Sequence, residues 1–477
     1  MTSAYSRYTR IEVPEEHPDE RIHDFREVLH AYTREEAVLE AQRCLQCDLP
    51  FCVEACPITQ DCRGYMGAIA KGEFDEAARL TLIANPLATT LCKVCYHYCE
   101  DACVMKGKGT PIAIRHLKRA ALDFGNAHKM YVPSAPKHQR IAVVGAGPAG
   151  LMAAWELGLR GYGVTVIERQ PAVGGQAGAI PRYRMPHHEL LIDLQRFREL
   201  DVTFVEGKTA GVDFTPESLL QEGYRAVFIA IGASKASTPG IPGETLPGVI
   251  PALDFLYDVN QGRPVILGRK IVVVGGGDVA VDAVRTSLRL SPGAHVTMAY
   301  RRTRSESPAG EEEIRETEPE GIEFRWLVSP LRILGTNHVS GMEFQRMELG
   351  PPDHSGRRAV QPIPNAVDRI DCDTVILAIG EKADLTGFPP ELNLKIGTKG
   401  WPEGSHPNTM TDVEGVFAAG GRSVVHAMAA GTKAAEGIDA YLAAKDGRPP
   451  TPRPEPFGEG EAPNWFPPGY SGPVWRP

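Results

Sequence analysis

Apolar and polar residues alternate along the chain in blocks that predict strands and helices in a fixed order. Between residues 140 and 168, an apolar run leads into a glycine-rich turn, an Ala- and Leu-rich helix and a second apolar run. The same order returns between residues 269 and 302. A strand that passes through a glycine turn into a helix and a second strand is typical of α/β proteins. The pattern therefore predicts an α/β fold with two such units.

Two further apolar runs predict how the two units are connected. Residues 226–232 and 374–380, "AVFIAIG" and "TVILAIG", each end on a glycine, as expected where the chain leaves one unit and enters the other. Residues 415–444 then supply a strand and a long Ala-rich helix that complete the first unit. We therefore expect the second unit to be inserted into the first.

The beginning of the chain has a helical pattern instead. Thr33 precedes two glutamates and an Ala- and Leu-rich stretch, which predicts a capped helix. Residues 64–86 place apolar side chains at helical spacing and predict a helical hairpin. The expected domains are a helical domain at 1–139, an outer α/β domain at 140–265 and 385–448, an inserted domain at 266–384 and a proline-rich tail at 449–477.

Charge and hydropathy exclude several classes of protein. The 477 residues include 51 basic and 60 acidic side chains, a formal net charge of -9 without a basic stripe, so nucleic acid is not an expected partner. No stretch approaches the roughly 18 apolar residues that span a bilayer, and the start lacks a signal-peptide core. We therefore expect a cytoplasmic protein without membrane insertion.

All but one of the ten cysteines lie in the helical domain. Residues 44–56 have the spacing C-x2-C-x4-C-x3-C followed by proline, and residues 92–103 have the spacing C-x2-C-x3-C-x3-C. The eight thiols match the ligand number of two [4Fe-4S] clusters: Cys44, Cys47, Cys52, Cys56, Cys92, Cys95, Cys99 and Cys103. Two zinc sites would use the same residues, but a Cys-Pro step after closely spaced cysteines is typical of ferredoxin loops. Disulfides are a weaker alternative in the cytoplasm.

Gly145, Gly147 and Gly150 have the G-x-G-x-x-G spacing of a dinucleotide-binding turn. The turn follows a strand and opens a helix, and Glu168 ends the next strand. Gly147 would let the backbone approach a diphosphate at the helix N-terminus, and Glu168 could bind ribose hydroxyls. The strand, helix and acid together predict a nucleotide site in the outer domain.

The second turn differs from the first in two respects. Gly275 and Gly277 are followed by Ala280 in the third position, which the fingerprint tolerates. At the end of its second strand, Tyr300 stands where the first unit has Glu168, and Arg301 and Arg302 follow. A carboxylate there would repel a 2′-phosphate, whereas guanidinium groups bind one. The second site is therefore predicted to prefer NADP(H) to NAD(H).

These motifs resemble one family of flavoproteins. The cysteine runs, "VVGAGPAGL", "GGQAGAIPRYRMP", "VVVGGGDVAVDAVRTSLRL", "YRR" with "EEE" after it, and "GVFAAGG" occur in the order found in the small (beta) subunit of NADPH-dependent glutamate synthase. The family also includes the large subunit of NADH-dependent ferredoxin:NADP oxidoreductase and the amino-terminal half of dihydropyrimidine dehydrogenase. The resemblance, from about residue 20 to 445, implies FAD in the outer Rossmann-like domain, NAD(P)H in the inserted one and two [4Fe-4S] clusters in the helical domain.

The resemblance also implies how the ligands are divided. It assigns the cysteines to two clusters across the two runs: Cys44, Cys47 and Cys52 with Cys103, and Cys56 with Cys95 and Cys99. The residues expected to bind FAD or NAD(P)H from the turns and the matching motifs are Gly145, Gly147, Pro148, Ala149, Gly150, Glu168, Arg169, Gly174, Gly175, Gln176, Arg184, Gly232, Gly275, Gly277, Asp278, Val279, Ala280, Arg301, Arg302, Gly380, Gly420, Gly421 and Arg422.

Two positions depart from the family pattern. Several relatives have a glutamine or glutamate ligand of the second cluster where this chain has Lys118, whose ammonium cannot bind iron. Cys92 is the expected replacement, with Cys62 as the alternative. Relatives also have an aspartate at the position of Gly421 in this chain, so backbone amides or Arg422 are expected to replace its contact with the flavin.

The proline-rich tail is a third departure. The stretch from residue 449 onward carries ten prolines together with aromatic side chains, among them Trp465, Phe466, Tyr470 and Trp475. Prolines exclude a helix, and aromatic residues are enriched at interfaces. The tail is predicted to be either a strap over its own surface or an anchor on a partner.

The predicted function is an electron-transfer flavoprotein subunit. It would take hydride from NADPH, or NADH, to FAD and pass single electrons through two clusters to a catalytic or electron-accepting subunit, and no acid–base residue is expected to be catalytic. An NAD(P)H:ferredoxin oxidoreductase module of another complex is one alternative, and a scaffold without flavin is another. A thioredoxin reductase type would need a C-x-x-C pair in the α/β units, where only Cys372 occurs.

Overall fold

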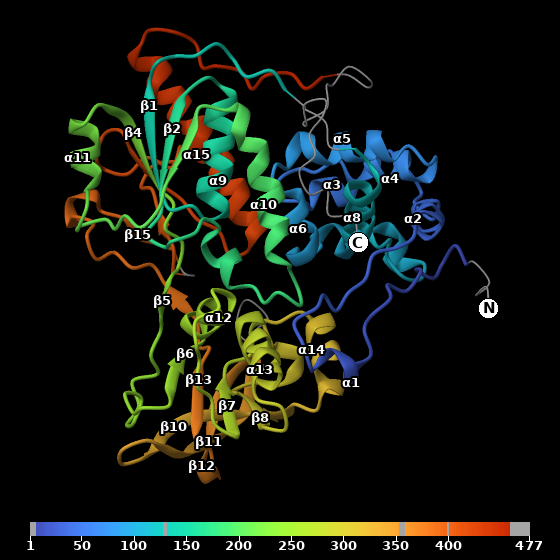
Figure 1. Ribbon diagram of the computed structural model, residues 1–477, viewed down its shortest axis with the longest axis vertical. Helices are drawn as coiled ribbons and strands as arrows, with labels where there is room; N and C mark the ends of the chain where they lie inside the picture. The colour runs from blue at the N-terminus through green and yellow to red at the C-terminus, as the bar shows by residue number, and fades with distance from the viewer. Residues whose placement is uncertain (1–5, 127–130, 353–357, 398–399, 458–477) are drawn as a thin grey trace.

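The computed structural model describes residues 6–126, 131–352, 358–397 and 400–457, and the chain folds into three units (Figure 1). A helical head, coloured blue to teal, lies beside an outer α/β unit, and a second α/β unit extends below both. The helices of the head are α1 (Pro18–Arg21), α2 (Arg34–Ala41), α3 (Phe51–Glu54), α4 (Cys62–Ala70), α5 (Phe74–Ala84), α6 (Ala88–Val94), α7 (Tyr98–Asp101) and α8 (Ile114–Phe124).

The outer unit is built on a parallel sheet of order β17-β4-β1-β2-β3. The helices that follow β1 and β17 pack against each other and against this sheet. The strands are β1 (Arg140–Val144), β2 (Gly163–Ile167), β3 (Val202–Val205), β4 (Tyr224–Ile229) and β17 (Val416–Ala418), and the helices are α9 (Pro148–Leu159), α10 (His187–Gln195), α11 (Pro216–Gln221) and α15 (Val424–Lys445).

The second α/β unit lies in the chain between β4 and β17, which confirms the predicted insertion. Its sheet, of order β6-β13-β7-β8-β9, is also parallel. The strands are β6 (Val249–Pro251), β7 (Lys270–Val274), β8 (His295–Tyr300), β9 (Glu323–Trp326) and β13 (Thr374–Leu377), and the helices are α12 (Ala252–Asn260), α13 (Asp278–Leu290) and α14 (Glu311–Thr317).

The inserted sheet begins earlier in the chain than residue 266, the predicted start of that domain. Its edge strand β6 has only three residues, so it leaves no readable apolar period in the sequence. An antiparallel ribbon extends from the same unit at the bottom of Figure 1. Its strands are β10 (Val328–Gly335), β11 (Val339–Pro352) and β12 (Arg358–Ile370).

The local predictions for the head hold in the structure. Thr33 caps α2 and forms a capping box with Glu36, which satisfies amides that a helix N-terminus otherwise leaves unpaired. Helices α4 and α5 form the predicted hairpin, and their apolar faces meet around Ile69 and Phe74. The hairpin holds the two cysteine runs next to each other.

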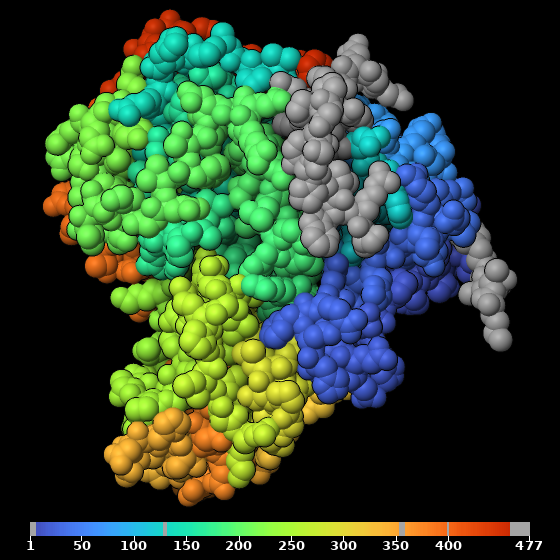
Figure 2. Space-filling model, viewed as in Figure 1, coloured from blue at the N-terminus to red at the C-terminus, as the bar shows by residue number. Residues whose placement is uncertain are grey.

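The head and the outer unit share one apolar core. Leu87 and Leu91 of the head pack in the same cluster as Trp155 of α9 and Met428 of α15. The head meets the inserted unit differently, through the segment around α1, which lies beside α14 in Figure 1 and covers the yellow surface in Figure 2. The position of the cofactor sites depends on both contacts.

The described part of the proline-rich tail lies along the surface as an irregular strap. Arg453 pairs with Glu156 at 3.0 Å, donates to the Ile83 carbonyl and covers the ring of Tyr131. The strap therefore ties the outer unit to the end of α5, whereas its four predicted anchor aromatics lie outside the described residues. Within the described ranges, no helix has the length and apolar character needed to cross a membrane.

Candidate cofactor sites

The first glycine turn leaves the N-terminus of α9 open. Gly145 has a φ of +107°, and a Cβ atom there would lie 2.6 Å from the Ala230 carbonyl oxygen. A Cβ atom at Gly147, by contrast, would meet only the Cα atom of Gly175, at 3.8 Å. No side chain caps α9 at Gly147, so the amides of its first turn could donate to an anion such as a diphosphate.

Glu168 supports this turn from the end of β2. It is buried, and its carboxylate accepts hydrogen bonds from the amides of Ala146 at 2.8 Å and Gln170 at 2.9 Å. Each carboxylate oxygen has a second lone pair, so Glu168 can hold the turn and still accept a ribose hydroxyl. The adjacent Arg169 pairs with Asp384 at 3.5 Å.

Other predicted residues of the outer unit border the same opening. The amide of Gly174 donates to the Ala146 carbonyl at 2.9 Å, and Gly175 lies against Gly147. Gln176 donates to the Ala233 carbonyl, beside Gly232. Pro148 and Ala149 form the start of α9, and Gly420, Gly421 and Arg422 precede α15. The contacts of Gly147 with Gly175 and of Gln176 with Ala233 therefore bring together residues from three separate segments of the outer unit.

The second glycine turn repeats the geometry of the first. Gly275 is held so close to β13 that a Cβ atom would overlap the Ala378 carbonyl oxygen. At Gly277 a Cβ atom would meet only the Cγ atom of Pro308, at 3.9 Å, and no side chain caps α13 there. Ala280 is buried in the third position, next to the half-buried Val279. Around Gly380 there is open space, as there is around Gly232.

Arg301 and Arg302 follow β8, but their side chains differ. Arg301 is exposed, whereas Arg302 is buried and donates from Nε to the Arg358 carbonyl at 3.2 Å. The Nη1 atom of Arg302 has no hydrogen-bond partner within the described ranges. A phosphate at this edge could therefore use the exposed guanidinium of Arg301, whereas the Nη1 atom of Arg302 is buried.

Four of the predicted ligands line one cavity in the head. They come from both cysteine runs and share the cavity with apolar side chains that include Met66 and Ile112: Cys44, Cys47, Cys52 and Cys103. Although no three His, Cys, Asp or Glu side chains of the described residues are arranged around a single ion, thiols around a cavity are what a cluster of several atoms requires.

Thiol chemistry in this cavity is consistent with cluster binding. Burial raises the pKa of Cys44 to about 11, although the Gln46 amide donates to it. A hydrogen bond with Cys62 lowers the pKa of Cys52 to about 7. The amides of Ile112 and Met105 donate to Cys103. Amide donors to sulfur stabilise the thiolate form that binds iron, so these residues fit a [4Fe-4S] cluster.

Cys56, Cys95 and Cys99 form a second group deeper in the head. Burial raises the pKa of Cys56 and of Cys95, and the ammonium of Lys118 opposes that shift in both thiols. The amide of His97 donates to the Cys95 sulfur at 3.4 Å. Three thiols beside one buried cation match the ligand set that the family resemblance implied, with its fourth position held by lysine.

The two candidates for the fourth ligand lie in different surroundings. Cys92 is buried in α6, and its thiol donates to the Thr89 carbonyl at 3.0 Å. Burial raises its pKa to about 12, while Lys93 and Lys118 oppose the shift. Cys62 is also buried, but its thiol forms hydrogen bonds with Cys52 and Cys99, one from each group. Lys118 thus lies near Cys92, whereas Cys62 lies between the two groups.

Residues 96–98, between the predicted ligands Cys95 and Cys99, contact both α/β units. The ring of Tyr98 packs on His426 of α15 with a centroid distance of 5.1 Å, and Arg422 lies over the same ring. On the other side, the Tyr96 hydroxyl donates to Asp278 of the inserted unit. These contacts place the loop of the second cysteine run between the start of α15 in the outer unit and the second glycine turn in the inserted unit.

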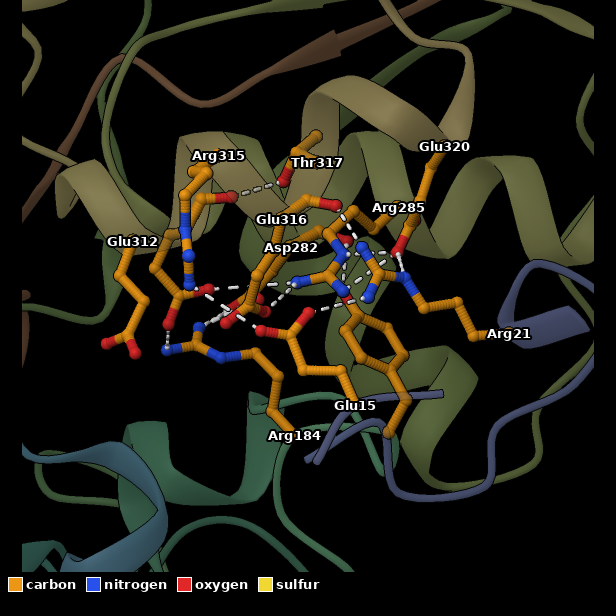
Figure 3. Close-up of polar contacts among 12 residues, drawn as sticks. Glu15, Arg21, Arg184, Asp282, Arg285, Glu312, Arg315, Glu316, Thr317 and Glu320 are labelled. Atoms are coloured by element: carbon orange, nitrogen blue, oxygen red, sulfur yellow. Dashed lines mark hydrogen bonds and ion pairs between the residues drawn. The ribbon is translucent and has the colours of Figure 1, made fainter. Parts of the chain in front are cut away.

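A buried charged network fixes the inserted unit against the rest of the molecule (Figure 3). Arg184 of the outer unit pairs with Asp282 at 2.8 Å and with Glu313 at 2.7 Å. Arg21 of the head pairs with Glu320 at 2.8 Å, and Figure 3 shows Arg184 and Arg21 reaching the same group of charged side chains. Arg184, predicted to bind a cofactor, thus has two carboxylate partners of its own.

Sequence reasoning missed Tyr96, Arg115 and Glu312 as site residues. Their partners are 182 and 197 positions away in the chain, so no local motif marks these contacts, although Glu312 lies in the "EEE" run of the family pattern. The only available signal was position, because Tyr96 immediately follows a cysteine with ligand spacing.

Comparison with known families covers almost the whole chain. Residues 21–130 match the family described as dihydropyrimidine dehydrogenase domain II, 4Fe-4S cluster, and residues 139–437 match the family described as pyridine nucleotide-disulphide oxidoreductase. The glutamate synthase [NADPH] small chain of Azospirillum brasilense is 33% identical over 467 residues, which covers 92% of this chain and 96% of that protein.

Two other relatives are longer than this chain. The NADP(+)-dependent formate dehydrogenase subunit beta of Moorella thermoacetica is 37% identical over 82% of this chain, and the NADPH-Fe(3+) oxidoreductase subunit beta of Geobacter sulfurreducens is 39% identical over 72%. The chain spans 60% and 53% of their lengths. Among solved structures, Mycobacterium tuberculosis FprA in complex with NADPH has a TM-score of 0.55 at 20% identity, over 65% of this chain and 86% of that chain. This likeness concerns the fold alone.

Proposed function

Because the chain belongs to the pyridine nucleotide-disulphide oxidoreductases and to the family of glutamate synthase small chains, we propose that it is the electron-input subunit of a larger redox complex. It is an NAD(P)H-dependent oxidoreductase with an iron–sulfur head. In the proposed reaction it takes hydride from NADPH and supplies single electrons to a partner subunit. The observation that carries this proposal is the contact of residues 96–98 with both nucleotide-binding units.

The two glycine turns are proposed to hold the two organic cofactors. The amides at the start of α9 would bind the diphosphate of FAD beside Gly147, and Glu168 would accept a ribose hydroxyl. The amides at the start of α13 would bind the diphosphate of NADP(H) beside Gly277, with Arg301 near the 2′-phosphate. Bound FAD supplies the chemistry that converts a hydride into two single electrons.

The eight predicted thiols are proposed to bind two [4Fe-4S] clusters. The cavity group provides one complete set of four ligands, with Cys103 supplied by the second cysteine run. The deeper group provides Cys56, Cys95 and Cys99, and Cys92 is proposed as its fourth ligand, since both Cys92 and Cys95 lie near Lys118. In that position Cys92 would have to leave its hydrogen bond to Thr89.

The order of the two groups follows from their surroundings. The deeper group lies toward the outer unit, because Cys95 and Tyr98 border the core that the head shares with α9 and α15. The cavity group lies nearer the surface, where Leu49 and Phe51 are 67% and 48% exposed. Electrons are therefore proposed to enter the head near Cys95 and to leave it near Phe51, where a partner subunit would dock.

The partner is proposed to determine the final acceptor. The three relatives above carry names of different complexes: a glutamate synthase, a formate dehydrogenase and an Fe(3+) oxidoreductase. A shared input subunit would explain why one chain type resembles parts of all three. A ferredoxin is the alternative acceptor, since the exposed apolar surface around Phe51 would also suit a transient contact.

The experiment that tests this function uses the purified chain under anaerobic conditions. We expect a yellow-brown protein whose flavin absorbance is bleached by NADPH, and more slowly by NADH. A colourless, folded protein would instead support a scaffold without flavin. Bleaching that is faster with NADH than with NADPH would contradict the assignment of Arg301 and Arg302.

A further inference from the structure

The second cysteine group is attached to the nucleotide-binding end of the inserted unit. The Tyr96 hydroxyl, next to Cys95, donates to the Oδ2 atom of Asp278. His97 lies with Nε2 3.3 Å from the Oε2 atom of Glu312, and its backbone has a φ of +41°, which non-glycine residues rarely adopt. Two consecutive side chains of a cysteine loop therefore contact α13 and α14.

Arg115 connects the same two units at the backbone of Cys95. Its Nη1 atom donates to the Cys95 carbonyl at 3.4 Å, and its Nη2 atom lies 3.1 Å from the Oε2 atom of Glu312. Burial opposes ionisation of Glu312, but its hydrogen bond with His97 and the charge of Arg115 lower its pKa. Glu312 is therefore a carboxylate at neutral pH, and it holds His97 and Arg115 in place.

Asp278 lies at the point where the nucleotide would bind. It is the first residue of α13, directly after Gly277, so its backbone belongs to the open turn. Its Oδ1 atom is buried and has no hydrogen-bond partner in the part of the chain that the structure describes. Burial and the nearby carboxylates of Glu313 and Asp282 raise the pKa of Asp278 to about 8. A neutral acid of this kind does not repel a diphosphate.

We propose that the hydrogen bond between Tyr96 and Asp278 couples nucleotide binding at the second glycine turn to the redox state of the cluster held by Cys95. This inference rests on the proposed function, since it requires a nucleotide at Gly277 and a cluster at Cys95. A bound diphosphate changes the charge beside Asp278, and the hydroxyl of Tyr96 responds at the other end of the same contact. The cluster and the nucleotide therefore influence each other's free energy.

Thermodynamic linkage sets the direction of the coupling between nucleotide binding and cluster reduction. The nucleotide is an anion, and reduction adds negative charge at the cluster, so each disfavours the other when they are coupled. A nucleotide bound at Gly277 therefore lowers the reduction potential of the cluster at Cys95, and reduction of that cluster weakens nucleotide binding. In turnover, the oxidised nucleotide would leave more readily once electrons have reached the head.

The coupling is tested with 2′-phospho-ADP-ribose, which has the phosphates of NADP(H) but no nicotinamide, so no hydride moves. Its dissociation constant is measured on the complete protein, oxidised and after reduction with dithionite. We expect reduction to weaken binding about fivefold or more and Tyr96→Phe to remove that difference. Potentiometric titration followed by electron paramagnetic resonance should show the reciprocal shift in the wild type but not in Tyr96→Phe.

Tyr98→Phe is the matched control, because it removes a hydroxyl from the same segment on the side that faces the outer unit. It should keep the wild-type difference in dissociation constant between the oxidised and the reduced protein. Dithionite reduces the flavin in every variant, so flavin reduction does not distinguish the variants. Asp278→Ala removes the acceptor of the hydrogen bond from Tyr96. This variant should bind the nucleotide equally well when oxidised and when reduced, whatever its affinity is. Equal affinities in the wild type, or a full difference in Tyr96→Phe, would overturn the coupling. A wild type without iron–sulfur signals would overturn the proposed function as well.

Discussion

The outer and inserted units carry the same glycine turn but meet the helical head in different ways. The outer unit shares an apolar core with the head, in which Leu91 and Trp155 belong to one cluster. The inserted unit meets it through buried polar contacts such as the pair of Arg21 and Glu320. Apolar contacts are not directional, whereas a buried ion pair is favourable in one geometry only. The difference indicates that the outer unit and the head form one body, and that a few polar contacts position the inserted unit.

The largest effect is expected from substitutions in the two glycine turns, which distinguish the flavin site from the nicotinamide nucleotide site. Gly147→Val and Gly277→Val each add a Cβ atom whose nearest protein atom lies at 3.8 Å and 3.9 Å, so both should fold while crowding the place of a diphosphate. Gly147→Val should purify with iron–sulfur colour but little FAD. Gly277→Val should keep its FAD and lose reduction by NADPH. Stoichiometric FAD in Gly147→Val would show that the flavin binds at another turn.

The next effect concerns the head. Cys92→Ser should lose one cluster or convert it to a three-iron form, while NADPH still reduces the flavin, because Cys92 is the proposed fourth ligand of the deeper group. Cys62→Ser is the matched control, since Cys62 is equally buried, and it should keep about eight irons, the content of two clusters. Iron and acid-labile sulfide per chain decide the question. The reverse pattern would identify Cys62 as the ligand.

A smaller effect tests the polar contact between the head and the inserted unit. Arg21→Met should lower the free energy of unfolding by about 1.5–3 kcal/mol, since hydrogen bonds to charged groups contribute this much. Arg26→Met removes an exposed pair with Asp24 and should change the stability much less, because water and salt screen an exposed ion pair. Urea denaturation of both variants measures the difference. Equal losses would mean that Arg21 does not position the inserted unit.

The smallest effect is expected after the second strand of each unit, where the two units carry different side chains. Replacing Arg301 and Arg302 together with glutamine should raise the KM for NADPH roughly tenfold or more and leave that for NADH nearly unchanged, because each lost charge-assisted hydrogen bond is worth about 1.5–3 kcal/mol. The single variants separate the exposed Arg301 from Arg302, which also holds the Arg358 carbonyl. Similar changes for both nucleotides would refute a role in binding the 2′-phosphate.

Much of the fold could be predicted from the sequence, because it depends on local patterns. The turns at Gly145 and Gly275 and the capped helix after Thr33 are short-range features with a fixed chemistry. The edge strand β6 could not be predicted, since three residues carry no period. The insertion followed from two apolar runs that each end on a glycine, and the structure confirms it.

The sequence predicted which types of residue form the candidate sites, but it could not predict the contacts between them. The spacing of the cysteines indicated cluster ligands, but it could not show that Cys62 lies between the two groups. Arg184 has the sequence context of a cofactor-binding residue, and only the fold brings Asp282 and Glu313 to it. Contacts of this kind join residues about a hundred positions apart, so no local pattern marks them.

The order of electron flow is tested most directly by reducing the anaerobic protein with NADPH and recording its electron paramagnetic resonance spectrum beside that of Gly147→Val. In the wild type we expect signals of reduced iron–sulfur clusters after NADPH is added. In the variant, which should lack FAD, NADPH should produce no such signals, whereas dithionite should still reduce the clusters. Cluster signals from NADPH in a variant without FAD, or none in a wild type with both cofactors, would contradict the account.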